Sequence, residues 1–169
     1  IGFQWGIKMY LGLDLGTSGL RGLLVQTNGK IIESAEAAYV VQHPQTGWSE
    51  QNPADWISAC NTVIATLRLA HPKSFSALKG VGVAGHMHGA TLLDDAGQVL
   101  RPCVLWNDSR AYNEAATLDA IPGFREVSGN IVFPGFTAPK VLWLAKHEPD
   151  VFSKIAKVFL PKDYLNYWL

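Results

Sequence analysis

The chain has 169 residues, of which 48% are apolar and 17% charged, and its 14 basic side chains equal its 14 acidic ones. This length allows one domain with its own core, and the balanced charge leaves no basic field for nucleic acid. No apolar run is as long as a membrane span, and no basic-then-apolar leader predicts secretion. Cys60 and Cys103 are isolated thiols, so we expect a cytoplasmic protein with neither a membrane nor a nucleic-acid partner.

The first third of the chain predicts three antiparallel strands in a meander. Apolar runs occupy residues 10–14, 20–26 and 31–41. The turn Gly16-Thr17-Ser18-Gly19 joins the first two, and Asn28-Gly29, a strong hairpin signal, joins the second and third.

A helix and a further strand follow the meander. Asn52 and Pro53 suit a helix start, and the pattern continues to about His71. Its apolar face is formed by Trp56, Ile57, Cys60, Val63, Ile64 and Leu67. Residues 78–84 then predict a short buried strand whose core residues are Val81 and Val83.

The rest of the chain predicts shorter elements. Strands are expected at 90–93 and 158–160, with an extended stretch at 99–106. Helices are expected at 109–118, from a cap at Thr137 or Ala138, at 149–155, and from Pro161 onward. A three-strand meander, a helix and parallel strands make an α/β order, which resembles the ribonuclease-H-like core of the actin, hexokinase and heat-shock ATPases.

The first candidate site is the turn after the first strand. Gly16, Thr17 and Ser18 offer backbone and hydroxyl donors that suit a phosphate, and Asp14 ends the strand before them. Asp14 can hold Mg²⁺ through water. The segment is not a Walker loop, and a polar hairpin turn with an incidental Asp is the structural alternative.

The second candidate site is Met87-His88, at the end of a core strand. His88 can hydrogen-bond to sugar hydroxyls, and Met87 can pack against sugar carbons. His86 and His88 are two nitrogen ligands without an evident third, so a metal is disfavoured. A satisfied histidine pair beside a glycine bulge is the alternative.

The third candidate site comprises Trp106, Asn107, Asp108 and Arg110. A flat ring covers the apolar face of a sugar, while amide, carboxylate and guanidinium groups read its hydroxyls. The alternative is a helix start capped by Asp108 or Ser109.

Six segments in order give the chain a resemblance to the FGGY carbohydrate kinases, especially those that phosphorylate xylulose. They are residues 10–19, 48–51, 87–94, 105–108, 134–140 and 160–164, and they extend from about Met9 to the last residue. The resemblance implies two ribonuclease-H-like domains around a cleft, with ATP and Mg²⁺ as cofactors. It implies ATP-dependent phosphorylation of D-xylulose to D-xylulose 5-phosphate.

The resemblance also assigns residues. Asp14 would hold the metal, with Gly16, Thr17 and Ser18 at the phosphates. Met87 and His88 would bind the sugar, and Trp106, Asn107, Asp108 and Arg110 would lie near it. The family usually has Gln where this chain has His86, and often Lys where it has Arg21, which changes the geometry of the cation.

The general-base Asp and most of the adenosine pocket would lie downstream, so this segment supplies no catalytic residue of its own. We expect residues 1–8 to be a leader or cloning remnant, and 9–169 to be an N-terminal kinase domain cut inside a helix. Its partners would be the sugar and the rest of its own chain, and a homodimer stays open. Two alternatives also stay open: a related kinase acting on ribulose, fuculose, gluconate or glycerol, and a non-catalytic actin-like sugar-binding module.

Overall fold

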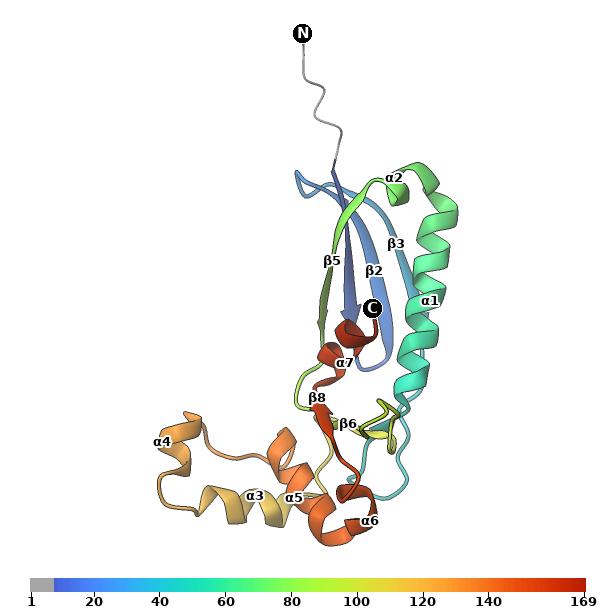
Figure 1. The fold of residues 1–169 in the computed structure, drawn as a ribbon. Coiled ribbons are helices and arrows are strands. Elements are labelled where there is room, and N and C mark those ends of the chain that lie inside the picture. The colour runs from blue at the N-terminus through green and yellow to red at the C-terminus, as the bar shows by residue number, and fades with distance from the viewer. Residues whose placement is uncertain (1–7) are drawn as a thin grey trace. The chain divides into compact units, whose positions relative to one another are not determined.

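The computed structural model describes residues 8–169 and divides into two compact units (Figure 1). Unit 1 comprises the chain up to Val40 together with Ala54–Gly85, and unit 2 comprises Val41–Pro53 and His86–Leu169. The leader expected at residues 1–8 lies outside the described residues, except for Lys8. Within residues 8–169, no helix is both long enough and apolar enough to cross a bilayer.

Unit 1 is built on a four-stranded mixed sheet. Its strands are β1 (Met9–Leu15), β2 (Gly19–Gln26), β3 (Ile31–Ala38) and β5 (Leu78–Gly85), in the order β3-β2-β1-β5. The β1–β2 and β2–β3 pairs are antiparallel, whereas β5 lies parallel to β1. The predicted meander, followed by a parallel strand, is therefore confirmed, although β3 ends three residues earlier than expected.

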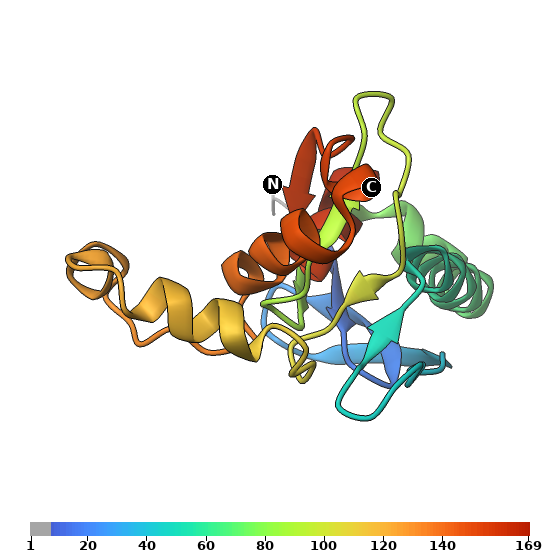
Figure 2. The same cartoon turned by 90° about the horizontal axis from the view of Figure 1, so that it is seen from below.

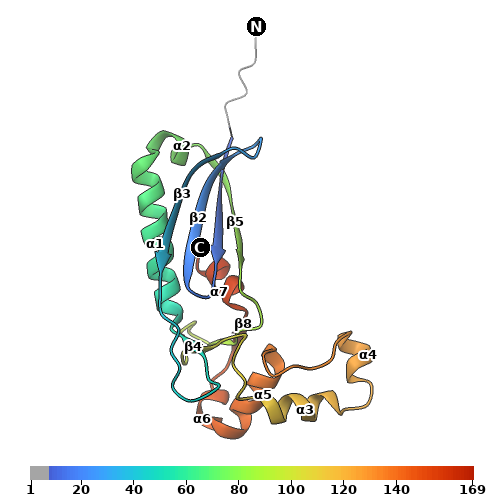
Figure 3. The same cartoon turned by 180° about the vertical axis from the view of Figure 1, so that it is seen from behind.

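Helix α1 (Pro53–Ala70) covers one face of this sheet (Figure 1, and from behind in Figure 3). The two are in close contact at Gly22 of β2, where a Cβ atom would lie 2.4 Å from Val63 Cγ1 and 3.1 Å from Leu67 Cδ1. The helix therefore packs directly onto the strand because Gly22 has no side chain. A short helix, α2 (Pro72–Ser76), which the sequence did not predict, connects α1 to β5.

The buried residues of unit 1 follow both expected periods. Leu11, Leu13 and Leu15 alternate along β1 and are at most 2% exposed, as expected from a strand with one covered face. On α1, the fully buried positions are Trp56, Cys60, Val63 and Leu67.

The expected core residues of β5 are wrong. Val81 is 50% exposed and Val83 is only half-buried. Val81 is in register with Leu11 and Val83 with Leu13, but β5 is an edge strand of the sheet and has a neighbouring strand on one side only. A short apolar run reads the same on an edge strand and a central one, so sequence could not separate them.

Unit 2 contains two small antiparallel ladders instead of an extended sheet. Strand β4 (Glu50–Gln51), which the sequence did not predict, pairs with β7 (Cys103–Val104), and β6 (Thr91–Leu93) pairs with β8 (Lys157–Phe159). The sequence predicted several parallel strands after the meander. Among the strands of residues 8–169, only β5 is paired in parallel, with β1.

Five helices complete the described part of unit 2: α3 (Tyr112–Asp119), α4 (Phe124–Ser128), α5 (Thr137–His147), α6 (Pro149–Phe152) and α7 (Pro161–Trp168). Figure 2 shows α3 and α5 side by side, with α4 beyond the end of α3. The N-cap of α5 is Phe136, not Thr137 or Ala138 as predicted. An apolar cluster packs α5 against β6 and the start of α3, and comprises Ala90, Leu92, Ala111, Trp143 and Leu144.

Candidate functional site

The turn after β1 is closed by its own backbone. Gly16 N–H donates to Gly19 O over 3.0 Å, and the Tyr39 hydroxyl donates to Gly16 O over 2.6 Å. A Cβ atom at Gly19 would lie 2.9 Å from Ala37 O, so this glycine allows β2 and β3 to approach each other. The Gly16 N–H is therefore already hydrogen-bonded within the turn. Both glycines are needed for the conformation of the turn.

A hollow of about 560 Å³ opens beside this turn and is lined by Asp14, Gly16, Ser18, Arg21 and Glu36, among others. Thr17 is not part of its lining. Arg21 forms an ion pair with Glu36 across β2 and β3, and both side chains are more than half exposed. Burial, and then the charge of Asp14, raises the pKa of Tyr39, so its hydroxyl stays a neutral donor to the turn.

The chemistry of Asp14 fits a magnesium ion that takes some of its ligands from the protein and the others from water and a bound phosphate. Its side chain is exposed at the end of β1 and borders the hollow. Among residues 8–169, no three His, Cys, Asp or Glu side chains form a ready ligand set. Mg²⁺ in proteins commonly takes one or two carboxylates and completes its shell with water and phosphate oxygens, which one carboxylate beside an open hollow allows.

The second candidate pair lies in unit 2, at a strained point of the backbone. His88 has φ = 66° and is the one non-glycine residue in the left-handed region within residues 8–169. Such a conformation costs about 1–2 kcal/mol for an ordinary L-residue and persists only where surrounding contacts enforce it. Met87, beside it, is 55% exposed.

The imidazole of His88 is held by an aromatic neighbour. Its ring stacks on Phe136, with centroids 4.6 Å apart and planes 30° apart. Burial, and then the charge of Lys140, lowers the pKa of His88. A neutral imidazole can both donate and accept, which suits a hydroxyl group.

A cavity of about 300 Å³ adjoins His88 and Phe136 in unit 2. Its other walls are Phe124, Ser128, Asn130, Ile131, Val132, Ala138 and Pro139. Sequence reasoning missed the α4 segment that supplies part of this wall. A signal was present, because α4 is flanked by Gly123 and Gly129, which both have positive φ and suit the ends of a short helix.

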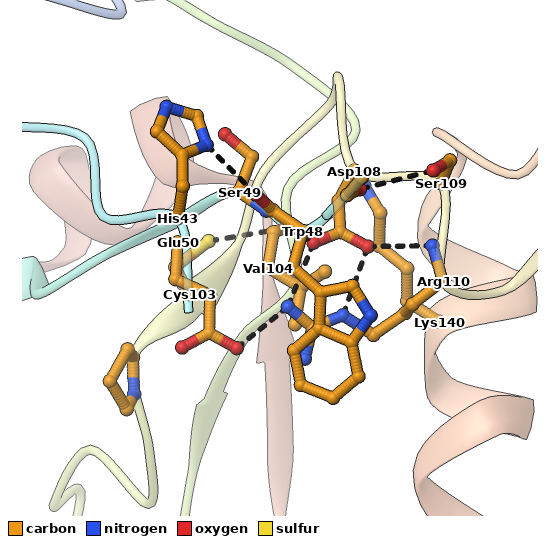
Figure 4. A network of polar contacts seen from close by, with 12 residues as sticks. His43, Trp48, Ser49, Glu50, Cys103, Val104, Asp108, Ser109, Arg110 and Lys140 are labelled. Atoms are coloured by element: carbon orange, nitrogen blue, oxygen red, sulfur yellow. Dashed lines mark hydrogen bonds and ion pairs between the residues drawn. The ribbon is translucent and has the colours of Figure 1, made fainter. Parts of the chain in front are cut away.

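The third candidate segment divides into an exposed and a buried pair. Trp106 is 48% exposed and Asn107 is exposed, whereas the side chains of Asp108 and Arg110 are 0% and 1% exposed. The Asp108 carboxylate accepts hydrogen bonds from Ser49 N at 2.6 Å and from Arg110 Nε at 2.9 Å and Nη2 at 2.8 Å (Figure 4). The exposed pair can reach a ligand, and the buried pair fixes the backbone beneath it.

Arg110 connects this anchor to the remainder of the network in Figure 4. Its Nη2 lies 2.7 Å from Glu50 Oε1, and its guanidinium carbon lies 3.6 Å above the centre of the Trp48 ring. Glu50 also pairs with Arg101, which in turn pairs with Glu148 at 2.5 Å. The alternative of a helix start capped by Asp108 or Ser109 is wrong: α3 begins at Tyr112 with Ala111 as its N-cap, because Asp108 is committed to Ser49 and Arg110.

Two of the candidate residues of unit 2, His88 and Trp106, lie against one loop, that of Gly135 and Phe136. Phe136 stacks on His88, and the preceding residue, Gly135, approaches Trp106 so closely that a Cβ atom there would lie 2.2 Å from Trp106 O. Asp14, Gly16 and Ser18, by contrast, share the hollow of unit 1.

Comparison with known proteins identifies the family. The model of the N-terminal domain of the FGGY family of carbohydrate kinases matches residues 9–169. The chain belongs to the FGGY family of carbohydrate kinases. As in other members, its fold is that of the actin- and hexokinase-like ATPases, as the element order predicted.

Proteins similar to this chain include several xylulose kinases. The chain is 49% identical to the xylulose kinase of Klebsiella pneumoniae over 159 residues, which are 94% of this chain and 32% of that protein. The structure of a xyloylose kinase from Brucella ovis matches with a TM-score of 0.93 and 60% identity, over 95% of this chain and 34% of that one. A xylulose kinase from Rhodospirillum rubrum matches with a TM-score of 0.90 and 33% identity, over 96% and 34%. The chain thus spans about a third of these FGGY relatives.

Proposed function

We propose that the full-length protein containing this FGGY domain catalyses the ATP-dependent phosphorylation of D-xylulose to D-xylulose 5-phosphate. The observation that carries the proposal is 49% identity, over 94% of the chain, to a protein described as a xylulose kinase. The exposed Met87 and the held imidazole of His88 support it, because they offer an apolar surface beside a hydroxyl-binding group.

Each candidate residue has a role in this proposal. Asp14 holds Mg²⁺ through water, and the metal neutralises phosphate charge when bound. The turn of Gly16, Thr17 and Ser18 orients the phosphates of ATP, with its shape held by Tyr39.

The proposed ketose-binding residues belong to unit 2. Met87 and the Trp106 ring contact carbon atoms of the sugar, while His88 and Asn107 bind its hydroxyls. Asp108 and Arg110 have no exposed surface with which to bind, so they keep Trp106 and Asn107 in place.

The proton-accepting Asp and most of the adenosine pocket are proposed to belong to the part of the protein beyond residue 169, which makes 9–169 an N-terminal kinase domain. Residues 1–169 by themselves should therefore show no turnover. An ADP-release assay of this segment with ATP, Mg²⁺ and D-xylulose checks this, and clear turnover would show that the segment contains its own base.

The full-length protein decides the substrate. Its kcat/KM should be highest for D-xylulose when compared with ribulose, fuculose, gluconate and glycerol. A higher value for one of these would assign a related kinase, and binding without turnover of any of them would assign a non-catalytic sugar-binding module.

Substitution of His88 ties the activity to the site. His88→Ala should raise the KM for D-xylulose about tenfold or more, because a hydrogen bond to the sugar is lost. His71→Ala is the matched control, since His71 pairs with Glu33 in unit 1. An unchanged KM in His88→Ala would place the sugar elsewhere.

A further inference from the structure

We infer that Lys140 is a positioning residue of the ketose site, because its buried ammonium ties the backbone of His88 to the loop that carries Phe136. The inference rests on the proposed function for the identity of the ligand. The tie itself is a property of unit 2 and can be measured without a substrate.

Lys140 lies in the first turns of α5 and is 0% exposed, which is rare for a lysine and needs internal partners. Its Nζ donates to His88 O over 2.7 Å and to Gly135 O over 2.6 Å. The charge therefore bridges two segments that are 47 positions apart in the sequence.

The two carbonyls bonded by Lys140 belong to segments that shape the proposed ketose site. His88 O belongs to the residue whose left-handed backbone an L-side chain avoids, so a strong donor on its carbonyl helps to hold that conformation. Gly135 O belongs to the loop that places Phe136 against the His88 ring. The Gly135 backbone also lies close to the carbonyl oxygen of Trp106.

The surroundings of Lys140 oppose its charge only in part. Burial, the largest effect, lowers the pKa of Lys140 to about 8, while Cys103 and Asp108 act to raise it and Arg110 to lower it. A pKa of about 8 still leaves the ammonium as the main form at pH 7. The same Asp108 anchors the Trp106 segment through Ser49. Loss of Lys140 would thus loosen both the His88 tip and the loop beside Trp106, and it would remove a donor from two part-buried carbonyls.

The test uses the full-length protein and three variants. Lys140→Met removes the ammonium and keeps a chain of similar length. Lys140→Arg keeps the charge but replaces the compact ammonium with a longer, planar group of donors, so its fit to the two carbonyls should be poorer. Lys146→Met is the control, because Lys146 belongs to the same helix and its side chain is 66% exposed.

In Lys140→Met, the KM for D-xylulose should rise at least tenfold, while the KM for ATP stays within twofold of the parent. Lys140→Arg should show a smaller rise, about threefold, and Lys146→Met none. A Lys140→Met protein with an unchanged KM for D-xylulose, or with equal rises in both KM values, overturns the inference. Should Lys140→Met not fold, Lys140→Arg decides: a rise for the ketose alone supports the tie, and two unchanged KM values refute it.

Hydrogen exchange separates this inference from the proposed function. Amides of residues 86–89 and of Phe133, Gly135 and Phe136 should exchange at least tenfold faster in Lys140→Met, and those of α3 at the parental rate. Uniform acceleration, or none, refutes the tie. A parent that does not phosphorylate D-xylulose refutes the proposed function, while the exchange result still reports on Lys140.

Discussion

The interiors of the two units of this FGGY domain differ in kind. In unit 1, leucines of β1 and β2 face the apolar side of α1, and the buried side chains there are almost all apolar. In unit 2, the apolar cluster is accompanied by buried Glu50, Asp108, Arg110 and Lys140. Apolar packing tolerates exchange of one side chain for another of similar volume, whereas a buried charge depends on each named partner.

The difference matters because the exposed candidate ligands of unit 2 depend on its buried charges. Trp106 and Asn107 project from a segment that is fixed by Asp108, and His88 is fixed through its carbonyl. The polar interior of unit 2 therefore positions the exposed candidate ligands, and this makes the unit sensitive to single substitutions. The comparison predicts larger losses for charge removal in unit 2 than for truncation in unit 1.

The largest loss is expected for Arg110→Met. It leaves Asp108 and Glu50 buried without one of their cations, which typically costs about 3–5 kcal/mol. Urea denaturation of the full-length protein measures the change. Arg21→Met is the control: its ion pair with Glu36 is more than half exposed, so about 0–1 kcal/mol is expected. Similar losses for both arginines would remove the distinction between buried and exposed pairs.

A core truncation in unit 1 should cost somewhat less. Leu67→Ala empties a fully buried position between α1 and the sheet, for about 2–5 kcal/mol, with about 3 expected. Leu69→Ala, two residues away and 85% exposed, should change stability by less than about 0.5 kcal/mol in the same denaturation experiment. If Leu69→Ala cost as much as Leu67→Ala, the face of α1 that packs on the sheet would be misassigned.

The contact of α1 with β2 gives a third comparison. Gly22→Ala adds a methyl group 2.4 Å from Val63 Cγ1, and overpacking of this kind costs about 1–3 kcal/mol. Gly82→Ala on β5 is the matched control, since no atom lies within 4 Å of its added Cβ, and it should be near neutral. Thermal melts of both variants report the difference, and a neutral Gly22→Ala would mean that the helix shifts freely.

Unit 1 could be predicted from sequence because its signals are local. The alternation of Leu11, Leu13 and Leu15, the Asn28-Gly29 turn and the periodic face of α1 each lie within one element. Register and burial at the edge could not be predicted, as the exposure of Val81 shows, since they depend on which strands become neighbours.

Unit 2 was predicted less well because its elements are fixed by distant partners. Strand β4 has two residues and exists through its pairing with β7, some fifty positions later. The candidate residues Trp106, Asn107, Asp108 and Arg110 were identified by type, but the sequence could not show that Asp108 and Arg110 would be buried. That outcome depends on Ser49 and Glu50, which the chain brings in from far upstream.

The smallest expected effect is a pH dependence that Lys140 should impose on stability. Burial lowers the pKa of Lys140 to about 8, below its ordinary value of 10.5. Between these values the unfolded chain binds more protons than the folded one, so stability should rise with pH, by about 1 kcal/mol at pH 9. Cys103 acts in the opposite sense above about pH 9, because burial raises its pKa to about 12.

The measurement is therefore a difference between variants. Urea midpoints of the parent and of Lys146→Met should gain stability from pH 7 to 9 relative to Lys140→Met, which lacks the titrating group. Asp108 and Arg110 are charged groups that face Lys140, and both are present in all three proteins. Parallel pH profiles for all three proteins would mean that Lys140 keeps its ordinary pKa. The two carbonyl acceptors and the charge of Asp108 would then offset the effect of burial in full.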